Sequence, residues 1–245
     1  MRYAIFLLTL LVCSTSYSCD SITVAGSDQW LPFAYSESDS NTPTGIAYDV
    51  VRLIGKKLNI PVNFNTGLPW KRIELGMETG SIDLLAGNYW NAERAESWHI
   101  TDAFANDEVR IFVRSGHAFP FDSLKDLEGR SGVMPRGISF GQAFDQYKSQ
   151  LDIHEVQQHT QMFAMLNLGR IDYMVLPYLN GQIKTKNLGF QGKIIALKNN
   201  VSVNGVHLSL SKKSDCRHLL PQINKVIQRA KDRGTIKDII KQYLK

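Results

Sequence analysis

Short apolar, β-branched runs alternate with amphipathic stretches along the chain from residue 21 onward. A buried strand gives a short apolar run, whereas a surface helix places apolar residues three and four positions apart. We therefore expect strands at residues 22–25, 62–64, 82–86, 110–113, 132–134, 173–176, 194–197 and 206–210. Helices are expected at 45–58, 70–78 and 139–151, with two more across 215–244 that break at Gly234. This alternation predicts an α/β fold.

One pattern occurs twice: a helix end, a glycine, and then a strand that begins with Ile-Asp. It is found at residues 77–84 and again at 166–173. Any α/β protein can repeat such a unit, but two further runs, near 110–114 and 203–210, are suited to crossing between halves. We expect two similar lobes joined by a two-strand hinge. Lobe one comprises residues 19–110 and 205–245, and lobe two comprises 111–204.

The first 18 residues have the organisation of a secretory signal. One basic residue precedes an apolar run that is too short to cross a bilayer, and small residues lead up to Cys19. We expect cleavage after residue 18 and a periplasmic location. The alternative is a buried N-terminal strand or helix.

Composition narrows the possible functions. The chain has 245 residues, of which 43% are hydrophobic, and no low-complexity tract, so its whole length is expected to fold. The net charge of +5 is evenly spread, which argues against nucleic-acid binding. Without the signal two cysteines remain, Cys19 and Cys216. In an oxidising compartment an even pair suggests one disulfide, the alternative being two free buried thiols.

Polar and aromatic residues follow the predicted strand 82–86. Asn88, Tyr89 and Arg94 lie in or beyond the loop that begins there, and ligands bind at the carboxyl ends of strands in open α/β sheets. The planar fork of arginine is suited to gripping a carboxylate through two parallel hydrogen bonds. Trp30 and Trp70 are candidates for apolar walls of the same cleft. The alternatives are a surface ion pair for Arg94 and core packing for each tryptophan.

The segment from Gly137 to Gly141 has the G-x-S-x-G pattern of a hydrolase nucleophile elbow, with Ser139 as the serine. Asp172 and His207 follow in triad order, but Pro135 and Arg136 separate the strand from the turn. A second interpretation is an anion-binding helix start formed by Gly137 and Ser139, and a third is Ser139 as a simple N-cap. No metal-ligand spacing or cofactor motif is present, so we expect no metal and no cofactor.

Several motifs, in order along the chain, resemble those of the bacterial family-3 extracellular solute-binding proteins, the receptors of polar-amino-acid ABC importers. They span residues 22–28, 32–33, 45–50, 80–83, 93–94, 100–104, 124–129, 169–172 and 234–236. The resemblance covers essentially the whole chain after the signal. It implies a two-lobed periplasmic-binding-protein fold of type II that closes on a small-molecule ligand, acts as a monomer, and delivers the ligand to a membrane ABC permease.

The resemblance also implies roles for individual residues. Arg94 matches the arginine that holds the ligand's α-carboxylate, and Trp30 and Trp70 fall at or next to the side chains that sandwich the ligand. Ser139 falls in the lobe-two loop that completes the carboxylate site. Asp28 matches an acidic position that faces the ligand's distal group in some members.

The sequence departs from the family where amino-acid binders carry an acid for the α-ammonium group. Pro177 stands there, followed by Tyr178. A buried ammonium group without a partner costs several kcal/mol, and cation–π contact with Tyr89, Trp90 or Tyr178 offsets only about 0.5–2 kcal/mol. We therefore expect a small carboxylate-bearing solute, an amino acid or a derivative of one, with the carboxylate better supported than the α-amino group, and no catalysis. The alternatives are an enzyme resembling cyclohexadienyl dehydratase, for which Asp28, Asp49 or Glu155 would supply the acid or base, and a sensory receptor without an importer.

Overall fold

The computed structural model describes residues 19–36 and 42–244, so the predicted signal peptide lies outside the described residues. Its strands are β1 Ile22–Ala25, β2 Gln29–Trp30, β3 Ala34–Ser36, β4 Pro43–Thr44, β5 Val62–Phe64, β6 Leu84–Tyr89, β7 Trp98–Ile100, β8 Ala105–Arg114, β9 Ser131–Pro135, β10 Asp152–Val156, β11 Tyr173–Pro177 and β12 Ile194–Ser211. Its α-helices are α1 Ile46–Leu58, α2 Trp70–Thr79, α3 Ala92–Ser97, α4 Gln142–Tyr147, α5 His159–Asn167, α6 Tyr178–Asn187, α7 Leu220–Asp232 and α8 Thr235–Tyr243.

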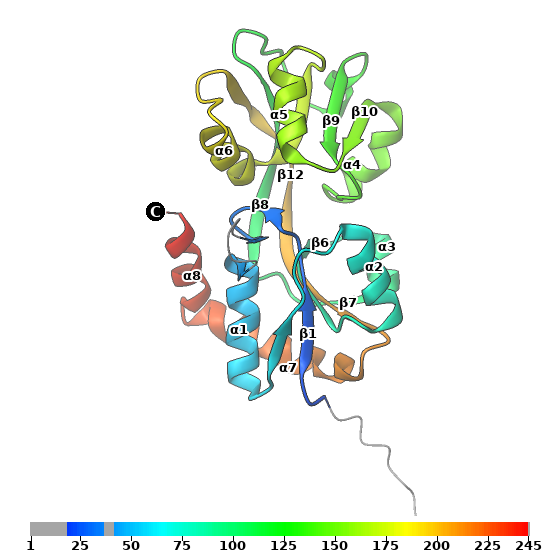
Figure 1. Ribbon diagram of the computed structural model, residues 1–245, viewed down its shortest axis with the longest axis vertical. Coiled ribbons are helices and arrows are strands. Elements are labelled where there is room, and N and C mark those ends of the chain that lie inside the picture. Colours follow the sequence, from blue (N-terminus) through cyan, green and yellow to red (C-terminus); the bar gives the residue numbers. More distant parts are fainter. Residues whose placement is uncertain (1–18, 37–41, 245) are drawn as a thin grey trace, which may run out of the picture.

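The main sheet has the strand order β10-β9-β11-β8-β12-β6-β1-β5 within the described residues, and it is folded into two lobes (Figure 1). Strands β1, β5 and β6 run parallel in one lobe, and β9, β10 and β11 run parallel in the other. Helices flank each half of the sheet. Parallel strands are covered on both faces, which is why β6 and β11 consist of buried residues throughout. The two-lobed α/β architecture confirms the predicted fold class.

Two long antiparallel strands, β8 and β12, connect the lobes (Figure 1), and Ala105 pairs with Val206 at one end while Arg114 pairs with Ile194 at the other. We predicted separate strands at 194–197 and 206–210, but both belong to β12. The residues between them are polar and partly exposed because the strand crosses from one lobe to the other there. The expected lobe boundaries, at 110/111 and 204/205, fall within these two connecting strands.

The repeated helix–glycine–strand pattern forms equivalent structures in the two lobes. The Asp83 N–H donates to the Thr23 carbonyl at 2.9 Å, and the Asp83 carboxylate accepts the Thr23 N–H at 2.7 Å. Asp172 does the same with Ser131, whose N–H lies 2.9 Å from the carboxylate. Each aspartate thus fixes the register between its own strand and the first strand of its lobe, which confirms the predicted internal similarity.

Several elements differ from the sequence prediction. The helix expected at 139–151 is confined to α4 and a short 3-10 turn at 148–150, because Gly141 has a non-helical φ of 98° before it and Leu151 is extended after it. Strand β10 was missed because its outward-facing residues are polar. The tail forms α7 and α8, separated at Gly234, where a φ of 73° suits glycine. Residues 215–219 before α7 form a 3-10 turn.

The predicted disulfide is present between Cys19 and Cys216, whose Cα atoms are 4.9 Å apart. It ties the chain just before β1 to the turn that precedes α7. Among the described residues, no helix is both long and apolar enough to cross a membrane.

Candidate functional site

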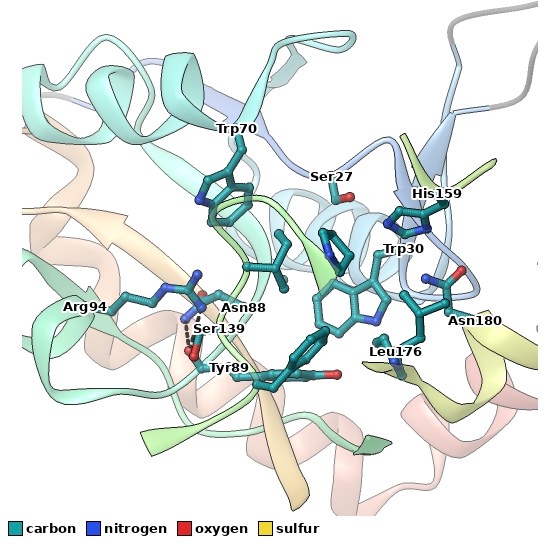
Figure 2. Close-up of a pocket in the computed structure, with 15 residues that line it drawn as sticks. Ser27, Trp30, Trp70, Asn88, Tyr89, Arg94, Ser139, His159, Leu176 and Asn180 are labelled. Carbon is teal, nitrogen blue, oxygen red and sulfur yellow. Dashed lines mark hydrogen bonds between the residues drawn. The ribbon is translucent and has the colours of Figure 1, made fainter. Parts of the chain in front are cut away.

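A pocket lies between the lobes, at the carboxyl ends of parallel strands from both half-sheets (Figure 2). Ser27 follows β1, Tyr89 ends β6, Pro135 ends β9, and Pro177 ends β11. The cavity volume is about 50 Å³, several times the space that one water needs. Its lining residues are Ser27, Trp30, Trp70, Gly87, Asn88, Tyr89, Arg94, Pro135, Ile138, Ser139, Phe140, His159, Leu176, Pro177 and Asn180.

Arg94 supplies the positive charge of this pocket. Asn91 caps α3 by accepting the Arg94 N–H at 2.8 Å, which places Arg94 in the first turn of the helix. The Arg94 side chain is only 8% exposed; it donates to the Tyr89 carbonyl at 3.1 Å, and its guanidinium lies 5.3 Å from the Trp70 ring. Four ion pairs are found among the described residues, and none involves Arg94.

Burial has the largest effect on the pKa of Arg94. It lowers the pKa of the guanidinium, and the carboxylates of Asp145, Glu74 and Glu93 oppose this from beyond ion-pair distance. None of these carboxylates lines the main pocket, and no other described acid does. Glu74, Glu93 and Asp145 instead line a neighbouring hollow, to which Arg94 also contributes.

Aromatic rings form the wall beside Arg94. Trp30 and Tyr89 pack edge to face with ring centroids 5.1 Å apart, and both donate to one buried carboxylate, Asp107, at 3.0 and 2.7 Å. Burial raises the pKa of Asp107 to about 6, and the two hydrogen bonds oppose that rise. Gly87 has a φ of 97°, and an added Cβ would lie 3.0 Å from the Trp30 ring. These contacts hold the indole of Trp30 flat against the strand end.

Asp145 occupies the predicted anion-binding helix start. Its carboxylate accepts a 3.1 Å hydrogen bond from the Phe140 N–H and a short one from the Ser139 hydroxyl. Ser139 Oγ also accepts the Gly141 N–H at 3.2 Å. Gly141, rather than Ser139, is the N-cap of α4. The protein's own carboxylate thus neutralises this helix start, and Arg94 is the one charged side chain among the described residues that line the pocket.

His159 and Asn180 line the side of the pocket away from Arg94, beyond Trp30 in Figure 2. They are 7% and 1% exposed, and neither His159 Nδ1 nor Asn180 Oδ1 has a hydrogen-bond partner. Burial lowers the pKa of His159 to about 3, and the Lys184 charge adds to that effect, so the imidazole is neutral. An unpartnered buried polar atom costs roughly 1–3 kcal/mol.

The two lobes contact each other directly across the cleft. Asn91 donates to Asp145 at 3.2 Å, the Ala92 N–H donates to Gln142 at 2.9 Å, and the His159 N–H donates to Gln29 at 3.4 Å. The pocket is therefore closed in by hydrogen bonds between lobe-one and lobe-two residues.

Six of the nine predicted ligand-binding residues line the pocket: Arg94, Trp70, Trp30, Asn88, Tyr89 and Ser139. The other three lie elsewhere. Gly137 lines a neighbouring hollow, and an added Cβ there would lie 3.0 Å from Trp70. Tyr178 stacks under the Arg110 guanidinium at 4.0 Å. Asp28 is exposed, and its carboxylate acts on the pKa of Lys184 in the other lobe, opposing the lowering that burial causes.

The three residues that would form a serine-hydrolase triad each bond to a different part of the protein. Asp172 bonds to the Ser131 backbone, His207 Nδ1 lies 2.8 Å from the Thr101 carbonyl oxygen, and Ser139 bonds to Asp145. None of the three bonds to another, so the G-x-S-x-G match does not form a nucleophile elbow.

Sequence reasoning missed His159 and Asn180. Asn180 follows β11 in the first turn of α6, so the strand-end rule that selected Asn88 applies to it as well. His159 is the first residue of α5, and it was missed together with the strand β10 that precedes it.

Comparison with known proteins identifies the family. The model of the bacterial extracellular solute-binding proteins, family 3, matches residues 22–245. The chain belongs to this family. The L-cystine-binding protein TcyA of Bacillus subtilis (strain 168) is 19% identical over 222 residues, covering 91% of this chain and 80% of TcyA. An L-glutamate/L-aspartate-binding protein of Pseudomonas aeruginosa is 26% identical over 161 residues, covering 61% of this chain and 53% of that protein.

Solved structures of similar fold are also two-lobed binding proteins. A histidine kinase sensor domain with similarity to periplasmic binding proteins superposes with a TM-score of 0.80, at 19% identity over 91% of this chain and 96% of that one. An ancestral arginine-binding protein bound to arginine gives a TM-score of 0.77, at 20% identity over 92% and 99% of the two chains. Membership of an extracellular family places the chain outside the cytoplasm, in the periplasm or beyond.

Proposed function

We propose that this solute-binding protein captures a small carboxylate-bearing solute between its lobes and presents the closed form to an ABC permease. The observation that carries the proposal is Arg94, a buried guanidinium that lines the pocket and makes no ion pair with a described residue. A buried charge is stable only when it is paired and hydrogen-bonded, and a bound carboxylate provides both.

The solute is not expected to carry an α-ammonium group. Pro177 occupies the end of β11, where amino-acid binders of the family carry an acid, and the described residues that line the pocket include no carboxylate. An ammonium group transferred into such a pocket loses its hydration without gaining a counter-charge. Hydroxy acids, keto acids and the monoamides of dicarboxylic acids each carry one carboxylate and no cationic group.

Binding is proposed to occur without chemical conversion. Of the acids considered as catalysts, Asp49 pairs with Arg52, Glu155 pairs with Lys148, and Asp28 is exposed at the surface. None of them lines the pocket. Arogenate and prephenate are the substrates to test, because measurable turnover of either would replace this proposal with an enzymatic one.

The decisive experiment compares matched solutes by thermal shift and calorimetry on the purified protein. Pairs that differ only at the α-position, such as lactate with alanine and glycolate with glycine, separate hydroxy acids from amino acids. The neutral amides of the same acids test the need for a carboxylate. Stabilisation by the hydroxy acids, and by neither the amino acids nor the neutral amides, is expected, since a ligand that binds only the folded state raises its melting temperature. Stabilisation by the amides or by cations would contradict the proposal.

Importer function has its own test. Deleting the gene should abolish uptake of the solute identified in the screen. If uptake persists while a transcriptional or chemotactic response to that solute is lost, a sensory role replaces import.

A further inference from the structure

On the side of the pocket away from Arg94, two buried side-chain atoms have no hydrogen-bond partner among the described residues. His159 Nδ1 and Asn180 Oδ1 are buried and unpartnered, and both side chains belong to the pocket wall (Figure 2). Buried polar atoms are nearly always paired in native proteins, so two orphans on one cavity wall indicate a partner from outside the chain.

The two residues come from different helices of lobe two, and both lie where a helix begins. His159 is the first residue of α5, and Asn180 is in the first turn of α6. Helix starts carry a partial positive charge. Lys184, one turn beyond Asn180 on α6, adds a positive charge on the same side. The exposed Asp28 carboxylate acts on Lys184 and offsets part of this charge, but no described carboxylate lines the pocket to pair with a cation.

Both side chains are uncharged, and each can donate and accept hydrogen bonds. An asparagine amide presents both a donor and an acceptor, and a neutral imidazole has one of each. The imidazole is neutral because burial, together with Lys184, lowers the pKa of His159 to about 3. Neither residue supplies the full charge that a second carboxylate of the solute would require.

We propose that His159 and Asn180 form a subsite for a neutral group of the solute that both donates and accepts hydrogen bonds, a hydroxyl or a primary amide. This inference rests on the proposed function, in which Arg94 holds the carboxylate of the same solute. It defines the solute as a short monocarboxylate with an uncharged polar group at its other end, and Trp30 lies between the two anchoring points.

The first test is a ligand series that holds the carboxylate constant and changes only the other end. For the four-carbon chain the members are 4-hydroxybutyrate, succinamate, butyrate, 4-aminobutyrate and succinate; three- and five-carbon sets cover other lengths. Calorimetry on the purified protein should show the hydroxyl or amide member binding about 10- to 100-fold tighter than the methyl and ammonium members of its set.

The second test uses variants of Asn180. Asn180→Leu keeps a similar volume and removes the hydrogen bonds, so the preference for a hydroxyl or amide over a methyl group should fall at least about tenfold. Asn180→Asp should shift the preference toward the ammonium member. Asn187→Leu, at the exposed far end of α6, is the matched control and should leave the ranking unchanged.

The outcomes separate the two proposals. If the wild-type protein binds no carboxylate of the series, the proposed function fails and this inference falls with it. If carboxylates bind and Arg94→Met removes them, but the methyl, ammonium or dicarboxylate member binds as well as the hydroxyl and amide members, only the subsite is wrong. The wild-type ranking decides this even if Asn180→Leu does not fold.

Discussion

Replacing Arg94 with methionine tests the proposed charge pairing most directly. Arg94→Met removes the cation from the pocket wall but keeps an unbranched apolar side chain against Trp70. Truncating one partner of a buried charge pair costs about 2–5 kcal/mol of binding, so the dissociation constant for a carboxylate solute should rise at least about 30-fold. Calorimetry with the tightest-binding member of the screen measures this rise.

The same substitution should barely affect folding. The variant loses the 3.1 Å hydrogen bond to the Tyr89 carbonyl and the contact with the Trp70 ring, worth about 1 kcal/mol each. It also relieves the desolvation of a buried charge, which is the cause of the lowered pKa of Arg94. We expect the free energy of unfolding of the unliganded protein to change by less than about 1 kcal/mol.

A matched control is Arg52→Met on α1, which removes a half-buried arginine outside the pocket that pairs with Asp49 at 2.8 Å. Its affinity for the solute should equal that of the wild type. Unchanged affinity in Arg94→Met would show that the carboxylate is held elsewhere. Unfolding of that variant would instead assign Arg94 a structural role, and the reasoning from its missing partner would be refuted.

Three further predictions concern closure, the disulfide and acid stability. Gln142→Ala removes the hydrogen bond that the Ala92 N–H donates across the cleft. Affinity for the solute should therefore fall about 2- to 10-fold, and small-angle scattering should show a more open protein. An unchanged radius of gyration would argue against a role for this contact in closure. Cys216→Ser breaks the disulfide to Cys19, which closes a loop of 197 residues. The free energy of unfolding, measured by denaturant titration, should fall by up to about 5 kcal/mol. An unchanged value would show that the disulfide does not stabilise the fold. His159 has its pKa lowered to about 3, so its stabilising contribution is complete above about pH 6.5 and is lost toward pH 3. At pH 4.5 that loss is roughly 2–3 kcal/mol, and His159→Gln should show a correspondingly shallower decline; parallel curves would show that the imidazole has the same pKa in the folded and unfolded states.

The buried parallel strands were the most predictable part of the fold. Strand β1 was predicted at its observed bounds because nearly all of its residues are buried. Strand β5 was also predicted at its bounds, although it is a partly exposed edge strand, because valine and phenylalanine favour strands. Strands that contain exposed polar residues were predicted poorly. The middle of β12 is polar because it crosses between lobes, and β10 was missed because alternate residues face outward.

The sequence by itself determined the family, the two-lobed fold and the side of the site that contains Arg94, Trp30 and Tyr89. These follow from local order: each residue stands at a fixed place after a recognisable strand, and the topology brings strand ends together. Only the tertiary structure decided which groups are satisfied. Asp145 neutralises a helix start that the sequence offered as an anion site, whereas His159 and Asn180 are left without partners. Burial and pairing depend on contacts between segments distant in the chain, and no local pattern of residues contains that information.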